Sequence, residues 1–179
     1  MSLNEILTVV RTYRPHFVTV TGGEPLMQAS CRELITRLCD AGYRVSLETS
    51  GALHITAIDQ RASIVMDIKS PSSGEMEKNR YENLARLSIK DQVKFVLQNR
   101  RDYEWAKAKL RKFHIPERCE VLLLPVCDDL HDVVDSEPGI AAPETLTPRT
   151  LASWILADRL PVRMQIQLHK YLWGDAPGR

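Results

Sequence analysis

The sequence lacks any apolar run near the roughly 18–20 residues that a membrane-spanning helix needs. Its first residues, Met1 to Glu5, also lack the basic start and apolar stretch of a signal peptide. No charge of one sign dominates, because 24 Lys and Arg residues face 23 Asp and Glu residues and leave a net charge of +1. We therefore expect a cytoplasmic protein with neither a membrane nor a nucleic-acid partner.

Cysteine is scarce and widely spaced. The four residues are Cys31, Cys39, Cys119 and Cys127, and none forms the close C-x2-C pair of a zinc or redox site. Disulfides are rare in a reducing cytoplasm. We expect buried free thiols, and no metal site made from these four residues.

Helical and strand patterns alternate along the whole chain. Ser2 to Glu5 has the pattern of a capping box ahead of an amphipathic helix. Asp102, and Thr147 followed by Pro148, are predicted to start later helices. Further helices are expected over 28–40 and 81–87, and strands over 17–20, 43–47, 63–66, 92–97, 121–124 and 162–168. This alternation predicts one α/β domain, 1–179, with a mainly parallel sheet and an acidic surface loop at 126–146.

Polar residues follow the predicted strands, where parallel α/β folds collect their active sites. In Thr21 to Pro25, two glycines allow a ligand close to the backbone, and Glu24 adds a carboxylate. Exposed amides beside a carboxylate suit a zwitterionic ligand. A phosphate-binding turn is the competing interpretation, although Glu24 would repel phosphate. Glu48, after the second strand, could bind a ligand or simply accept hydrogen bonds from local backbone N–H groups.

Thr21 to Leu26 resembles the Gly-Gly-Glu motif of radical S-adenosylmethionine (SAM) enzymes. The wider pattern is similar to that of the 7-carboxy-7-deazaguanine synthase family. The matching elements follow the family's order along nearly the whole chain: 21–28, 48–51, 67–74, 94–96 and 167–173. The resemblance implies a partial (β/α)6 TIM-like barrel. It also implies conversion of 6-carboxy-5,6,7,8-tetrahydropterin to 7-carboxy-7-deazaguanine with loss of ammonia, on the route to queuosine.

The resemblance also implies cofactors and binding residues. The cofactors are SAM, a 4Fe-4S cluster and Mg²⁺, with an electron donor such as flavodoxin as partner. Glu24 with Gly23 would hold the methionine end of SAM, and 67–69 would line its adenosyl side. The pterin substrate would contact Thr21, Gln167 and His169. The full set of expected SAM-binding residues is Gly22, Gly23, Glu24, Ser50, Asp67, Ile68, Lys69, Leu124, Pro125, Val126 and Cys127.

The sequence departs from the family in one respect. The family binds its cluster through a C-x3-C-x2-C loop after the first barrel strand, and no such motif occurs in the 179 residues. We therefore expect the first strand, that loop and the nearby Mg²⁺ ligand to be absent, and the chain as given to be inactive. The strand over 17–20 would then be an open edge that favours a homodimer. Two alternatives are a truncated or degenerate SAM-binding remnant and an unrelated α/β phosphate-binding enzyme.

Overall fold

The computed structural model describes residues 1–126 and 146–174, apart from the side chains of residues 169 and 171. Helices and strands alternate except at β2, β3 and β4, which follow one another with no α-helix between them, so the predicted alternation holds only in part. The elements are α1 (Leu3–Tyr13), β1 (Phe17–Val20), α2 (Cys31–Asp40), β2 (Arg44–Thr49), β3 (Ser63–Asp67), β4 (Gln92–Leu97), α3 (Arg100–Phe113), β5 (Glu120–Pro125), α4 (Pro148–Asp158), β6 (Arg163–Met164) and α5 (Leu168–Trp173).

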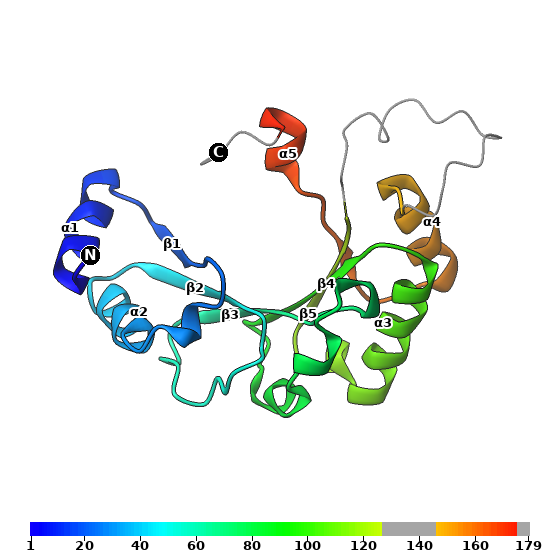
Figure 1. Cartoon of the computed structure of the whole chain (residues 1–179), viewed down its shortest axis with the longest axis horizontal. Coiled ribbons are helices and arrows are strands. Elements are labelled where there is room, and N and C mark those ends of the chain that lie inside the picture. Colours follow the sequence, from blue (N-terminus) through cyan, green and yellow to red (C-terminus); the bar gives the residue numbers. More distant parts are fainter. Residues whose placement is uncertain (127–145, 175–179) are drawn as a thin grey trace.

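The six strands form one sheet in the order β1-β2-β3-β4-β5-β6, and every neighbouring pair is parallel. The predicted α/β fold with a parallel sheet is confirmed. Figure 1 shows α2 and α3 on one side of the sheet, while the other side is left largely open. Because all strands run the same way, their carboxyl ends meet at one edge, which we call the carboxyl edge. The opposite edge is called the amino edge.

The two faces of the sheet differ in chemistry. Alternate residues of each central strand, such as Leu47, Met66 and Phe95, are buried against the helices in one core. The residues between them form the open face, and many of these are polar. Thr19 and Ser46 share a hydrogen bond of 2.9 Å across β1 and β2 on this face. The open face is therefore a surface that polar ligands and water can contact.

Helix starts show where local patterns succeed and where they mislead. The capping box at Ser2 is confirmed, and Thr147 caps α4 by accepting a hydrogen bond from the Thr150 N–H. The prediction that Asp102 caps a helix is wrong, because Asn99 is the N-cap of α3. The helix expected over 28–40 starts only at Cys31, after a short 3-10 turn at Pro25–Met27. The helix expected over 81–87 is a 3-10 helix, Tyr81–Arg86.

The last strand is shorter than the predicted 162–168, since β6 covers only Arg163–Met164. The Gln165 N–H still donates to the Leu123 carbonyl at 3.0 Å. The next bond of a parallel ladder would need an N–H from residue 125, which is proline. The chain therefore leaves the sheet and enters α5.

Two residues mark the ends of the described chain around 127–145. The Val126 N–H donates to the Leu97 carbonyl at 2.9 Å, and the Leu146 N–H donates to the Gln98 carbonyl at 3.0 Å. Leu146 is buried in the core. The predicted acidic loop lies almost wholly outside the described residues. Within the described part of the chain, no helix is both long and apolar enough to cross a membrane.

Candidate functional site

The turn after β1 stands at the carboxyl edge and is open to solvent. Gly22 and Gly23 both have positive φ, +104° and +51°, which explains why glycine occurs twice here. No heavy atom lies within 4 Å of the position that a Cβ would take on either residue. Thr21 is exposed beside them. A ligand therefore has direct access to the backbone of this turn.

The Glu24 side chain does not stand free at this edge but is bonded to two loops. Its Oε1 accepts a hydrogen bond from the Leu26 N–H at 3.1 Å. Its Oε2 accepts from the Ser50 N–H at 2.8 Å and from the Ser50 hydroxyl. The Thr49 hydroxyl lies 2.9 Å from both oxygens. We call this arrangement the Glu24 clamp. It joins the turn after β1 to the end of β2, and a ligand ammonium would share these oxygens with the protein donors.

These contacts also set the charge of the clamp. Burial alone would raise the pKa of Glu24, but hydrogen bonds from Ser50, Leu26 and Thr49 together lower the pKa below its usual value. Glu24 is therefore a carboxylate at neutral pH. An anion at this position attracts an ammonium group and repels a phosphate.

Gly51 contacts the Glu24 clamp through the Thr49 hydroxyl. Its φ is +69°, and a Cβ there would lie 2.7 Å from the Met66 side chain. Its N–H donates to the Thr49 hydroxyl at 3.1 Å, and that hydroxyl in turn contacts Glu24. The core side chain of Met66 thus fixes the backbone that orients Thr49. Sequence reasoning missed Thr49, although it belongs to the 48–51 element.

The end of β3 supplies a second charged group. Asp67 and Lys69 form an ion pair of 2.9 Å. The other oxygen of Asp67, Oδ1, is buried and has no hydrogen-bond partner among the described residues. Ile68 lies between them and is buried in the core, and its N–H donates to the Lys94 carbonyl at 2.9 Å. An unsatisfied buried acceptor suits a ligand that brings a hydroxyl donor.

A cavity of about 340 Å³ opens beside this pair, and we call it the carboxyl-edge cavity. It brings together three of the residues predicted for the adenosyl side, Asp67, Lys69 and Val126. Leu124 and Pro125 are buried beneath it, and Cys127 lies outside the described residues. Neither Glu24 nor Ser50 is among the lining residues. Five further residues complete the lining, and sequence reasoning named none of them for this role: Ser70, Ser72, Ser73, Val96 and Gln98.

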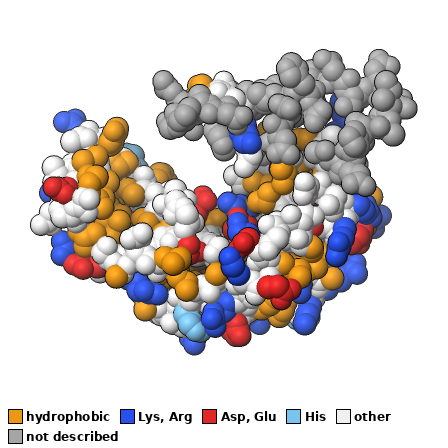
Figure 2. Space-filling view, viewed as in Figure 1, with side chains coloured by type: hydrophobic (Ala, Val, Ile, Leu, Met, Phe, Trp, Pro, Cys, Tyr) orange, Lys and Arg blue, Asp and Glu red, His pale blue; other side chains and the backbone are white. Residues whose placement is uncertain are grey.

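Charged side chains continue across the open face. Lys94 on β4 lies 3.4 Å from Glu48 on β2, and both point away from the helix layer. The alternative in which Glu48 accepts hydrogen bonds from local backbone N–H groups is thus replaced by a side-chain ion pair. Figure 2 shows acidic and basic side chains gathered in the hollow over the central strands.

The predicted pterin-binding residues come from two distant parts of the chain. Gln167 is half-buried and immediately precedes α5, and His169 lies within α5 instead of on a strand. The His169 side chain is outside what the structure describes. Thr21 belongs to the turn after β1.

The described thiols do not fit an iron–sulfur cluster. Cys31 and Cys39 are buried on α2, and Cys119 is buried just before β5, near the amino edge. Burial raises the pKa of Cys31 and Cys39, and it raises the pKa of Cys119 to about 11. Thiols with raised pKa values are poor metal ligands. Within residues 1–126 and 146–174, no three His, Cys, Asp or Glu residues form a metal-binding group.

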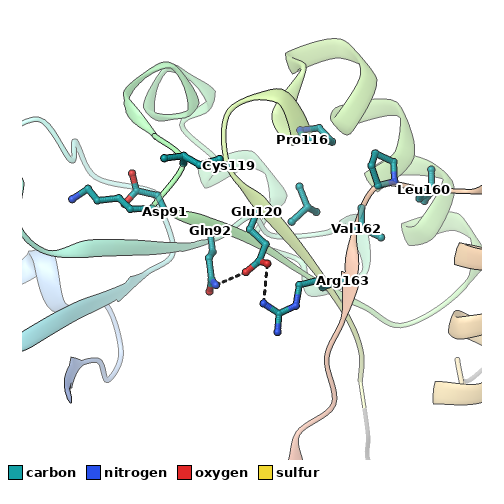
Figure 3. A pocket seen from close by; sticks show the side chains of 12 residues that line it. Asp91, Gln92, Pro116, Cys119, Glu120, Leu160, Val162 and Arg163 are labelled. Atoms are coloured by element: carbon teal, nitrogen blue, oxygen red, sulfur yellow. Dashed lines mark hydrogen bonds and ion pairs between the residues drawn. The ribbon is translucent and has the colours of Figure 1, made fainter. Parts of the chain in front are cut away.

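A second cavity, of about 520 Å³, lies at the amino edge. Figure 3 shows a chain of contacts within it, in which Gln92 and Arg163 both bind Glu120. These two contacts measure 2.6 Å and 2.8 Å. Asp91 is labelled in the same view. Glu120 thus has two polar partners in the lining of this cavity.

A parallel sheet with a Gly-Gly turn and charged groups at its carboxyl edge defines the chain as an α/β protein, in a class that commonly places its ligand sites at that edge. No protein-family model matches the chain. Two curated relatives match the chain in sequence, and both are named 7-carboxy-7-deazaguanine synthase. The protein from Chlorobaculum tepidum is 39% identical over 99% of this chain and 76% of its own length. The protein from Koribacter versatilis is 36% identical over 97% and 76%. The chain belongs to the 7-carboxy-7-deazaguanine synthase family.

Solved structures agree on the fold. QueE from Escherichia coli has a TM-score of 0.66 at 19% identity, with 93% of this chain and 64% of that chain covered. Streptococcus suis SuiB has a TM-score of 0.60 at 10% identity, covering 93% and 43%. The chain thus spans about three quarters of its curated relatives and less than two thirds of the QueE chain.

Proposed function

We propose that this chain forms the SAM-binding and substrate-binding part of a 7-carboxy-7-deazaguanine synthase, in a partial TIM-like barrel. The reaction would convert 6-carboxy-5,6,7,8-tetrahydropterin to 7-carboxy-7-deazaguanine and ammonia. The observation that carries the proposal is the Glu24 clamp, an ionised carboxylate beside an open Gly-Gly backbone in a member of this family. When bound, SAM supplies the radical chemistry that protein side chains cannot perform.

Each group of residues has a defined task in this proposal. Glu24 binds the ammonium of SAM, and the turn at 21–23 offers its backbone to the methionine end. Asp67 pairs its free Oδ1 with a ribose hydroxyl, and Lys69 holds the other oxygen of Asp67 in place. Thr21, Gln167 and His169 bind the pterin.

A second candidate function is cofactor binding without turnover, by a truncated or degenerate chain. It is supported by the described thiols, which are buried and do not fit a cluster. Both candidates require SAM to bind, and they differ only in whether product forms. The phosphate-binding alternative is disfavoured, because the Glu24 carboxylate would repel phosphate.

Calorimetric titration of SAM tests the proposal. Hydrogen bonds to charged groups contribute about 1.5–3 kcal/mol. Glu24→Ala should therefore weaken SAM binding roughly 10–100-fold. The matched control is Glu33→Ala, which removes an exposed carboxylate of α2 that pairs with Arg37. Equal affinity of the Glu24→Ala chain and the unmodified chain would contradict the assignment. Competition by inorganic phosphate at the same turn would favour the phosphate-binding alternative instead.

A further inference from the structure

Asp102 is a fully buried carboxylate that the function proposed above does not use. It lies in the first turn of α3 with a relative exposure of 0%. Its Oδ1 accepts hydrogen bonds from the Ser72 N–H at 3.1 Å and the Ser72 hydroxyl at 3.0 Å. Its Oδ2 accepts from the Gln98 N–H at 3.0 Å. No ion pair to Asp102 occurs among the described residues, so these donors alone offset the cost of burying it.

The three donors belong to two walls of the carboxyl-edge cavity. Ser72 lies in the short 3-10 turn Pro71–Ser73 after β3, and Gln98 immediately follows β4. Both residues line the cavity, whereas Asp102 lies behind them and does not. Asn99 strengthens the link, because its side-chain amide donates to the Ser72 hydroxyl at 2.9 Å. One carboxylate thus sets the separation of the two walls.

The cavity is built for a ligand with several hydroxyl groups. Its lining includes three serines, Gln98 and Asp67, and the Oδ1 of Asp67 is buried with no hydrogen-bond partner among the described residues. The ribose of an adenosyl group presents two neighbouring hydroxyls that can donate to such acceptors. Binding of this kind depends on wall spacing, since a displacement of about 1 Å can cost up to 100-fold.

We infer that Asp102 is a positioning residue for the adenosyl half of the ligand, because it joins the two walls that enclose the ribose. This inference rests on the function proposed above and deepens it. Asp102 acts through Ser72 and Gln98 and does not itself touch the ligand. The methionine half, which the Glu24 clamp would hold, is independent of it.

The fold supplies a matched control at the amino edge. Asp91 is also buried, with 3% exposure, and it accepts hydrogen bonds from the Ser88 N–H and the Ser88 hydroxyl, both at 2.8 Å. Its other oxygen accepts from the Ile64 N–H at 2.8 Å. The donor set is therefore the same as that of Asp102. Asp91 lines the amino-edge cavity, where Figure 3 labels it, and is not among the residues that line the carboxyl-edge cavity.

The experiment compares Asp102→Asn with Asp91→Asn in the full chain. Each substitution replaces one carboxylate oxygen by an amide NH₂ group, which then faces an N–H or O–H donor and cannot accept its hydrogen bond. Both variants should therefore have a lower thermal unfolding midpoint. Titrations use SAM, adenosine and methionine at a temperature where circular dichroism shows both variants folded. Asp102→Asn should weaken SAM and adenosine about 10-fold and leave methionine unchanged. Asp91→Asn should change none of the three affinities by more than about twofold.

The possible outcomes distinguish failure of the inference about Asp102 from failure of the proposed function. Equal loss of adenosine affinity in both variants would show a merely structural role and overturn the inference about Asp102. Absence of SAM binding by the unmodified chain would overturn the proposed function, and the inference with it. If Asp102→Asn does not fold, Ser72→Ala is compared with Ser88→Ala. Each of these variants removes one hydroxyl hydrogen bond to the buried carboxylate. Unchanged adenosine affinity in Ser72→Ala would then refute the role of this link.

Discussion

Glu24 contributes its charge to the fold as well as to the proposed site. The donors of Ser50, Leu26 and Thr49 favour the ionised side chain in the folded protein, and its pKa lies below the ordinary value of 4.5. A carboxyl whose pKa is depressed by folding stabilises the protein above its unfolded-state pKa. That stabilisation is lost as the pH falls from about 4.5 through the lower folded-state pKa.

We expect Glu24→Gln to remove this acid dependence. The variant should lose roughly 1–3 kcal/mol of unfolding free energy at pH 7, because a charged acceptor is replaced by a neutral one. Between pH 5 and pH 3 its stability should fall less steeply than that of the unmodified chain. Urea unfolding at a series of pH values measures both effects. Glu33→Gln, on the exposed Glu33–Arg37 pair, is the control and should change little. Parallel pH profiles for the two chains would contradict the prediction.

At this scale the sequence identified residues but not their partners. Glu24 and the residues at 48–51 were singled out separately, because each follows a strand. That Thr49 and Ser50 bind Glu24 depends on the pairing of β1 with β2, which joins residues about 25 positions apart. Likewise, aspartate is a favourable N-cap residue, but the Asp102 carboxylate accepts a hydrogen bond from the Ser72 hydroxyl, 30 positions away. Local patterns carry no information about such contacts.

At the scale of elements, β1 is an edge strand with exposed apolar neighbours. In the described sheet it pairs only with β2. Phe17 on β1 is 68% exposed, and Tyr13 at the end of α1 is 78% exposed. Helix α1 itself has no fully buried residue. An open strand edge with exposed apolar side chains favours association.

We therefore expect the isolated chain to dimerise or aggregate through β1. Sedimentation at increasing concentration should show a mass that rises for the unmodified chain and less so for Phe17→Lys. Ile89→Lys is the matched control, because Ile89 is 88% exposed but lies at the amino-edge cavity. A stable monomer with strong hydrogen-exchange protection at Val18 and Val20 would refute the prediction.

Strand positions were predictable where short runs rich in Val and Phe are bounded by polar or turn residues. The limits of β1 and β4 agree with the predicted 17–20 and 92–97. The end of β6 was not predictable from its own residues, because the missing ladder donor is Pro125 on the neighbouring strand. The short 3-10 turns were also missed, since their signals are too brief to separate from those of a helix.

At the scale of the whole molecule, the question is whether these residues alone support turnover. We expect the 179-residue chain, reconstituted anaerobically with iron and sulfide, to show no stoichiometric 4Fe-4S absorption. It should also form no 7-carboxy-7-deazaguanine, because Cys31 and Cys39 are buried on α2 and Cys119 is buried just before β5, so these three thiols do not converge on one cluster.

The control is the same chain joined to an N-terminal strand and loop that carry C-x3-C-x2-C, which should gain both properties. A stoichiometric cluster and product formation without the added segment would overturn the expectation. Normal SAM binding by the unmodified chain, measured in parallel, would separate a missing cluster from a misfolded site.

Val126 and Leu146 are both attached to the end of β4, through the neighbouring carbonyls of Leu97 and Gln98. The described chain therefore stops and resumes at neighbouring points of the sheet. Because both hydrogen bonds are accepted by consecutive carbonyls, a substitution that displaced the end of β4 would move the attachment of β5 and the approach to α4 together.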